Sequence, residues 1–172
     1  VKLAFDYGRE ELTQLLRRDS DGFNRWEAGN RLAVGILQDL IADDLAGRPL
    51  ALDARLVEAY RELLTDKALD AAPVAHILTL PGEAYLSELA DTIEVEAVHR
   101  ARQFARRELA QRLRPEFEAV YATQRSVEPY RANAEQIARR SLHNLALAYL
   151  LQLDTPELID LAWHQFDQAD NM

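Results

Sequence analysis

The sequence contains no cysteine among its 172 residues. Disulfide bonds, thiolate metal sites and cysteine nucleophiles are therefore excluded together. The absence of cysteine fits a cytoplasmic protein, because disulfides are rare in the cytoplasm. The sequence also lacks an apolar run of about 18 residues and a basic leader followed by an apolar stretch, so we expect neither a membrane helix nor a signal peptide.

Basic residues are outnumbered by acidic residues, 20 against 29, which gives a net charge of -9. The average field of the protein therefore repels phosphate backbones and anionic lipid headgroups. The arginines between residues 100 and 114 alternate with glutamates, a pattern that is typical of a solvated helix face. We expect no nucleic-acid partner and no membrane partner.

Motifs for catalysis are also missing. The six glycines are widely dispersed, so no Gly-rich phosphate loop is present, and no serine lies in a Gly-x-Ser-x-Gly elbow. None of the four histidines belongs to a His-Glu-x-x-His zinc motif. The sequence therefore predicts no catalytic, cofactor-binding or metal-binding residue in this chain.

Two pairs of residues have a spacing that could serve a metal. Glu96 and His99 are three residues apart, and Asp160 and His164 are four apart. A di-iron bundle needs two Glu-x-x-His elements and two further glutamates, and only one such element is present. We therefore interpret these histidines as surface or helix-end residues, and a metal-binding bundle ranks third among the functional hypotheses.

The composition that is present indicates a folded domain, since 48% of the residues are hydrophobic and 28% are charged. Residues 1–7 alternate apolar and polar positions, which predicts a short strand ending at Gly8. A single strand leaves its backbone groups unpaired. The segment therefore either lies against helices or is the last strand of a sheet that is otherwise absent.

All later segments have helical periodicity. The second helix is expected to begin at Asn24, with Glu27 as its capping-box partner, and Gly47 lies near its end. Asp53 should begin the third helix, and Pro115 should kink or interrupt a long one. The predicted helices cover residues 9–18, 24–46, 53–64, 71–79, 83–90 and 95–121, and two more begin at Asn133 and at Thr155–Pro156.

The fold class predicted from this pattern is all-α. Short loops between the helices favour an irregular α-solenoid or a bundle of paired antiparallel helices. No strict sequence repeat supports the solenoid. The helix after Asn133 is apolar on every side between Ala146 and Leu151, which indicates that it is buried between others.

A polar cluster lies at the entrance to that buried helix, formed by Arg139, Arg140, His143 and Asn144. It could line a cavity or face a neighbouring domain, where arginine would bind carboxylates. It could instead satisfy the carbonyl ends of adjacent helices, and we favour this structural role. Trp26 and Trp163 lie on apolar stripes and are predicted to anchor the core.

Four segments, taken in order, resemble the C-terminal half of bacterial aminopeptidase N, a family of zinc gluzincin aminopeptidases. None of the four is a catalytic signature, and the specificity comes from their order and spacing along nearly the whole chain. The segments are residues 21–28 (DGFNRWEA), 75–81 (AHILTLP), 138–150 (ARRSLHNLALAYL) and 165–172 (QFDQADNM).

The resemblance implies that residues 1–7 are the last strand of a preceding β-sandwich and that residues 8–172 are an incomplete C-terminal helical domain. The family's zinc motif and Gly-x-Met-Glu-Asn loop do not occur in this sequence, so the zinc belongs to the parent enzyme. The expected partners are the catalytic and β-sandwich domains of the same polypeptide and the peptide substrates of the parent.

The leading hypothesis is a non-catalytic helical fragment of an enzyme that removes N-terminal amino acids from peptides. Its role would be to wall the active-site chamber and limit substrate access. The alternative is a free-standing helical scaffold that binds a protein partner. A helical fragment should also expose apolar surface, which predicts self-association.

Overall fold

The computed structural model describes residues 7–125 and 130–169, and every regular element in these ranges is a helix. The predicted all-α class is confirmed. The predicted strand at residues 1–7 lies outside the described residues, except for Tyr7, which precedes the first helix in an irregular segment. The elements are α1 (Arg9–Arg18), α2 (Gly22–Leu45), α3 (Ala54–Thr65), α4 (Ala71–Leu78), α5 (Glu83–Glu88), α6 (Val95–Arg112), α7 (Arg114–Gln124), α8 (Ala134–Leu150), a 3₁₀ turn (Leu151–Leu153) and α9 (Pro156–Asp167).

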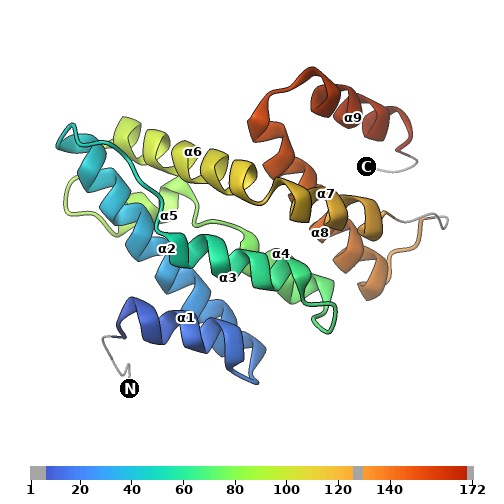
Figure 1. Ribbon diagram of the computed structural model, residues 1–172, viewed down its shortest axis with the longest axis horizontal. Coiled ribbons are helices and arrows are strands. Elements are labelled where there is room, and N and C mark those ends of the chain that lie inside the picture. The colour runs from blue at the N-terminus through green and yellow to red at the C-terminus, as the bar shows by residue number, and fades with distance from the viewer. Residues whose placement is uncertain (1–6, 126–129, 170–172) are drawn as a thin grey trace.

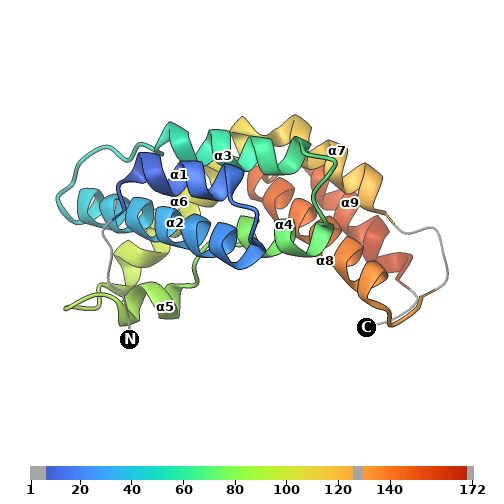
Figure 2. The ribbon, with the colours of Figure 1, turned by 90° about the horizontal axis from the view of Figure 1, so that it is seen from below.

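The helices are stacked along one long axis, with α1 near one end and α9 near the other (Figures 1 and 2). Consecutive helices form two tightly packed hairpins, α1 with α2 and α7 with α8. Contacts between distant segments join these hairpins, because α2 also packs against α6, and α8 packs against α4. The arrangement matches the predicted irregular stack of paired helices.

The core follows the apolar face of each helix. In α3 the buried residues Leu56, Val57, Tyr60 and Leu63 have the spacing of one helical face. In α8, Ala146, Leu147, Tyr149 and Leu150 are all buried, which confirms that this helix lies between others. The apolar run in α8 therefore reflects contact with α4, α6 and α7 on different sides. The C-terminal half of α8 is therefore buried between these helices.

The predicted cap of the second helix is wrong by three residues. Asp21, and not Asn24, is the N-cap, because its side chain accepts a hydrogen bond of 2.9 Å from the Asn24 backbone N–H. The helix then starts at Gly22 and includes Asn24 and Glu27. Asp21 lies three residues before an N–H of the first turn that has no intrahelical partner, and its carboxylate accepts from that N–H. The helix therefore begins before Asn24, which lies inside it. At the other end, Gly47 adopts a positive φ of 65°, and the helix has ended at Leu45.

Three other boundary predictions are confirmed. Asp53 caps α3 by accepting from the Arg55 N–H, and Asn133 caps α8 by accepting from the Gln136 N–H. Pro115 lies in the first turn of a new helix, α7, which Leu113 separates from α6 with φ −120° and ψ 20°. Proline is tolerated in a first turn because its missing N–H has no intrahelical partner there. Among the described residues, no helix has the length and apolarity needed to cross a membrane.

Candidate functional site

The predicted polar cluster forms a layer between α7, α8 and α9. His143 is buried, its ring stacks on Tyr121 with centroids 4.1 Å apart, and its Nδ1 lies 2.9 Å from the Tyr121 carbonyl oxygen. On the other side, His143 Nε2 lies 2.9 Å from Gln165 Oε1, and Gln165 Nε2 donates to Asn144 Oδ1 over 2.9 Å. The α7–α9 polar layer, defined as Tyr121, His143, Asn144 and Gln165, therefore ties three helices together.

Arg139 has the structural role predicted for the cluster, which is to bond the carbonyl end of an adjacent helix. Its guanidinium donates to the carbonyl oxygens of Thr123 and Arg125 over 3.4 and 3.3 Å. These carbonyls lie at the C-terminal end of α7, where backbone oxygens have no intrahelical donor. Arg140 differs, because its guanidinium stacks over the ring of Tyr130 at 4.8 Å and donates to the Gln136 side chain.

The protonation state of His143 determines how the layer is bonded. A neutral imidazole protonated on Nδ1 donates to the Tyr121 carbonyl, and its Nε2 can then only accept. The Gln165 amide must in that case present its NH₂ group to the ring, and Asn144 must reverse with it to keep their mutual bond. Burial lowers the pKa of His143, although its contacts with Tyr121 and Gln165 act in the opposite direction. The neutral form is thus the one that the folded environment favours.

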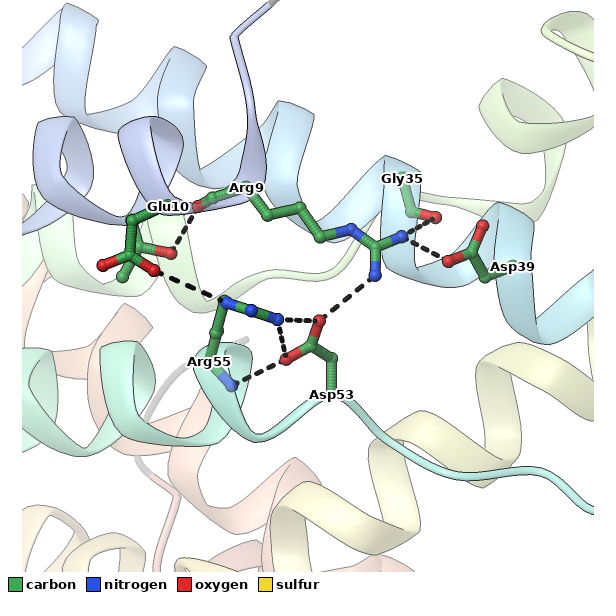
Figure 3. A network of polar contacts seen from close by, with 7 residues as sticks. Arg9, Glu10, Gly35, Asp39, Asp53 and Arg55 are labelled. Atoms are coloured by element: carbon green, nitrogen blue, oxygen red, sulfur yellow. Dashed lines mark hydrogen bonds and ion pairs between the residues drawn. The ribbon is translucent and has the colours of Figure 1, made fainter.

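A second cluster joins the N-terminal helices (Figure 3). Arg9 in α1 donates to Asp39 and to the Gly35 carbonyl in α2, and to Asp53 Oδ2 over 3.1 Å. Asp53 also accepts from Arg55 Nη1 over 3.0 Å. Partial burial acts to raise the pKa of Asp53, but hydrogen bonds from Arg55 and Arg9 and the charge of Arg55 outweigh it and hold this pKa below its usual value. These arginines and aspartates neutralise one another's charges, and their bonds hold the start of α3 against α1 and α2.

The histidines of the two pairs with metal-like spacing contact other side chains in the structure. His99 Nδ1 lies 3.0 Å from Glu83 Oε1, while Glu96 pairs with Arg100. On α9, His164 contacts Gln168. Within residues 7–125 and 130–169, no group of three histidine or acidic side chains is arranged to hold a metal ion.

The two tryptophans have different environments. Trp26 packs against the core and stacks on His76 with ring centroids 5.2 Å apart, as a core anchor should. Trp163 is 62% exposed, so its prediction as a core anchor is wrong. It forms an exposed apolar face on α9 with Ile159 and Phe166, because these residues are three or four positions apart on a helix. Among the residues of α9, only Leu158 is buried.

Two buried tyrosines donate hydrogen bonds that we did not predict from the sequence. Tyr149 in α8 donates to the Leu78 carbonyl over 2.7 Å, and Tyr60 in α3 donates to the Ile77 carbonyl over 3.4 Å. Both carbonyls lie at the buried C-terminal end of α4. Burial raises the pKa of both hydroxyls, so they remain neutral donors. Tyrosine in an otherwise apolar helix was the available signal, since a buried hydroxyl usually finds a partner.

The sequence can be compared with known families. Residues 9–172 match a family described as a domain of unknown function (DUF3458_C) with ARM repeats. The chain belongs to this family. ARM-type domains stack helices into solenoids, which agrees with the helical stack observed along the long axis.

Relatives of this ARM-repeat domain include bacterial aminopeptidases. The chain is 35% identical over its full length to "Aminopeptidase N" of Escherichia coli (strain K12) and 30% identical to that of Haemophilus influenzae. It also superposes with a TM-score of 0.81 and 26% identity on the crystal structure of Legionella pneumophila aminopeptidase A in complex with aspartic acid, over 98% of this chain. The predicted resemblance to aminopeptidase N is confirmed.

The matches cover only part of each relative. This chain corresponds to 20% of the Escherichia coli protein, 19% of the Haemophilus influenzae protein and 20% of the Legionella pneumophila chain. It therefore spans about a fifth of the length of these relatives. The chain is a helical domain of the kind found in aminopeptidases.

Proposed function

We propose that this ARM-repeat domain is a non-catalytic part of a zinc-dependent aminopeptidase that removes N-terminal amino acids from peptides. The observation that carries the proposal is the match to bacterial aminopeptidases along the full length of this chain. In this proposal the zinc and the catalytic residues belong to other domains of the same polypeptide, which acts in the cytoplasm.

The role proposed for the domain is to wall the active-site chamber and to limit which peptides enter it. Rigid inter-helix bonds support this role, because a wall must keep its shape when peptides collide with it. Arg139 secures the end of α7, the Tyr149 hydroxyl secures the end of α4, and the α7–α9 polar layer joins three helices. Each of these contacts joins one helix to another.

A hydrolysis assay tests the division of labour. The purified chain should hydrolyse leucine arylamide no faster than a protein-free blank, with or without added zinc. The complete enzyme, with its zinc domain, should hydrolyse the same substrate and lose activity with a chelator. Zinc-dependent hydrolysis by the chain alone would overturn the proposal.

Hydrogen–deuterium exchange in the complete enzyme tests the chamber wall. A bound peptide inhibitor should slow exchange at backbone amides of this domain that face the chamber. The matched control is the same enzyme with an inhibitor too small to extend beyond the zinc site. Protection by the peptide that is confined to the other domains would contradict a role as chamber wall.

The alternative function is a helical scaffold that binds a protein partner. The exposed face of α9 favours it, since Trp163 and Phe166 are 62% and 71% exposed. The reading frame on either side of this segment separates the two functions. An uninterrupted frame that continues into a zinc domain with a His-Glu-x-x-His motif would reject the free-standing scaffold.

A further inference from the structure

A hollow of about 300 Å³ opens on the surface where α1, α2 and α3 meet. This volume is at the small end of the range for ligand sites, so it would suit a molecule of few atoms. The buried Leu63 and the partly buried Leu69 supply an apolar part of its lining. Its charged lining consists of Arg17, Arg25, Glu62 and Asp66.

One pair of these charges is already satisfied. Arg17 donates to both carboxylate oxygens of Glu62 through its Nε and Nη2 atoms, which is a bidentate pair. A ligand gains little by competing with such a pair, because it would have to replace two charge-assisted hydrogen bonds. Binding must therefore use the other two charged residues.

Arg25 and Asp66 are the charges that remain. Arg25 is half-buried and uses its Nε to donate to the Leu16 carbonyl over 2.9 Å. Asp66 uses Oδ1 to accept from the Ala68 N–H over 2.9 Å. In the described part of the chain, neither side chain takes part in an ion pair. The hollow thus offers one cation and one anion beside an apolar surface.

We propose that this hollow binds a small zwitterion with an apolar side chain. The ligand's carboxylate would pair with Arg25, its ammonium group with Asp66, and its side chain would cover Leu63 and Leu69. A free α-amino acid and a dipeptide share this chemistry. The match of three different groups distinguishes this ligand class from a simple anion, which the Asp66 carboxylate would repel.

Nuclear magnetic resonance of the ¹⁵N-labelled chain provides the test. Leucine should cause saturable shifts in the backbone amide signals of residues 59–69. Leucinamide, which lacks the carboxylate, N-acetylleucine, which lacks the ammonium group, and glycine, which lacks the side chain, should each bind more weakly. A parallel titration with leucyl-leucine shows whether the free amino acid or the dipeptide binds more tightly. Either order supports the proposal, because both ligands are zwitterions with an apolar side chain.

Two variants separate the roles of the charges. Asp66→Asn keeps an oxygen that can accept from the Ala68 N–H, so the turn is preserved while the charge is lost. It should weaken leucine and leucinamide binding about tenfold, as expected for one charge-assisted contact, and should not weaken N-acetylleucine, whose carboxylate the Asp66 charge repels. Arg25→Gln keeps a donor for the Leu16 carbonyl and should weaken leucine and N-acetylleucine binding, but it should not weaken leucinamide, which has no carboxylate to pair with Arg25.

Asp70→Asn is the matched control, because Asp70 is exposed, precedes α4 and does not line the hollow. It should bind leucine as the wild-type chain does. The proposal is overturned if leucine causes no saturable shift up to its solubility limit, or if Asp70→Asn weakens binding as much as Asp66→Asn. A wild-type chain that binds leucinamide and N-acetylleucine as well as leucine would also overturn it.

Discussion

At the scale of single residues, the buried hydroxyl of Tyr149 bonds to the end of α4. It is the donor for the Leu78 carbonyl at the end of α4, a group that is buried in the core. Its ring also stacks on Phe117 with centroids 4.6 Å apart. A phenylalanine at this position would keep the stacking and remove only the hydrogen bond.

We therefore expect Tyr149→Phe to lower the free energy of unfolding by about 1–3 kcal/mol, since it leaves a buried carbonyl without a donor. Urea denaturation of the wild-type and variant chains measures this difference. Tyr85→Phe is the control, because Tyr85 is 43% exposed and its hydroxyl can bond to water. Equal stability of all three chains would show that the Leu78 carbonyl does not depend on Tyr149.

The buried imidazole of His143 predicts a dependence of stability on pH. Burial lowers its pKa in the folded chain below the ordinary value of 6.5. As the pH falls below 6.5, the unfolded chain takes up a proton that the folded chain resists, so the free energy of unfolding should fall. Above this range both states hold a neutral ring, and His143 adds no pH dependence.

The ring signals of His143 in a nuclear magnetic resonance titration measure this effect directly. The folded chain should titrate with a midpoint below that of the same residue in urea. His143→Asn should lose part of the pH dependence of the unfolding free energy between pH 8 and pH 5, values chosen to span roughly the ordinary histidine range. A folded midpoint above the unfolded one would reverse the sign and refute the prediction.

At the scale of elements, two of the three glycines in helix α2, Gly29 and Gly35, have opposite surroundings. A Cβ at Gly29 would lie 3.0 Å from Ile77 Cγ2 and 3.2 Å from Leu16 Cδ1, so this glycine allows α1 and α4 to approach α2 closely. A Cβ at Gly35 would meet nothing within 4 Å. The two sites thus separate the intrinsic cost of glycine in a helix from its value in packing.

Gly35→Ala should stabilise the chain by about 0.5–1 kcal/mol, which is the difference in helix propensity. Gly29→Ala should lack this gain or destabilise the chain, since the stiff Ile77 side chain must move away from the new methyl group. Urea denaturation of the two variants under identical conditions provides the comparison. A gain at Gly29 equal to that at Gly35 would show that the contact between these helices is not tight.

The boundaries of the elements show what local signals can predict. Asp53, Asn133 and Pro115 were placed correctly because a cap or a first-turn proline acts on backbone groups only a few residues away. The cap of α2 was misplaced because Asp21 and Asn24 are both good capping residues. Local propensity could not choose between them, and the observed hydrogen bond from the Asn24 N–H decides it.

At the scale of the whole molecule, α9 exposes an apolar face. Ile159, Trp163 and Phe166 are 40%, 62% and 71% exposed and lie on one side of the helix. Adjacent exposed apolar side chains favour association, because contact removes them from water. The net charge of -9 opposes association and weakens as salt screens it.

We expect the chain to self-associate at high concentration, and more strongly when salt is added. Light scattering over a range of concentrations measures the average mass. The double variant Trp163→Ser with Phe166→Ser should remain monomeric, whereas Phe23→Ser, which removes a 67% exposed residue from α2, should behave as the wild type. A monomeric wild-type chain at all concentrations would contradict the prediction.

The sequence by itself determined the helical class, most helix boundaries and the resemblance to aminopeptidase N, since these depend on short-range periodicity and on ordered local segments. The tertiary structure decided which side chains meet across the chain. Tyr149 reaches a carbonyl 71 residues away, and His143 meets Gln165 only because α9 folds back over α8. Trp163 looked like a core residue, and only the packing of α9 left it exposed. Burial and long-range pairing depend on how helices stack, and helical periodicity within one segment carries no information about its neighbours.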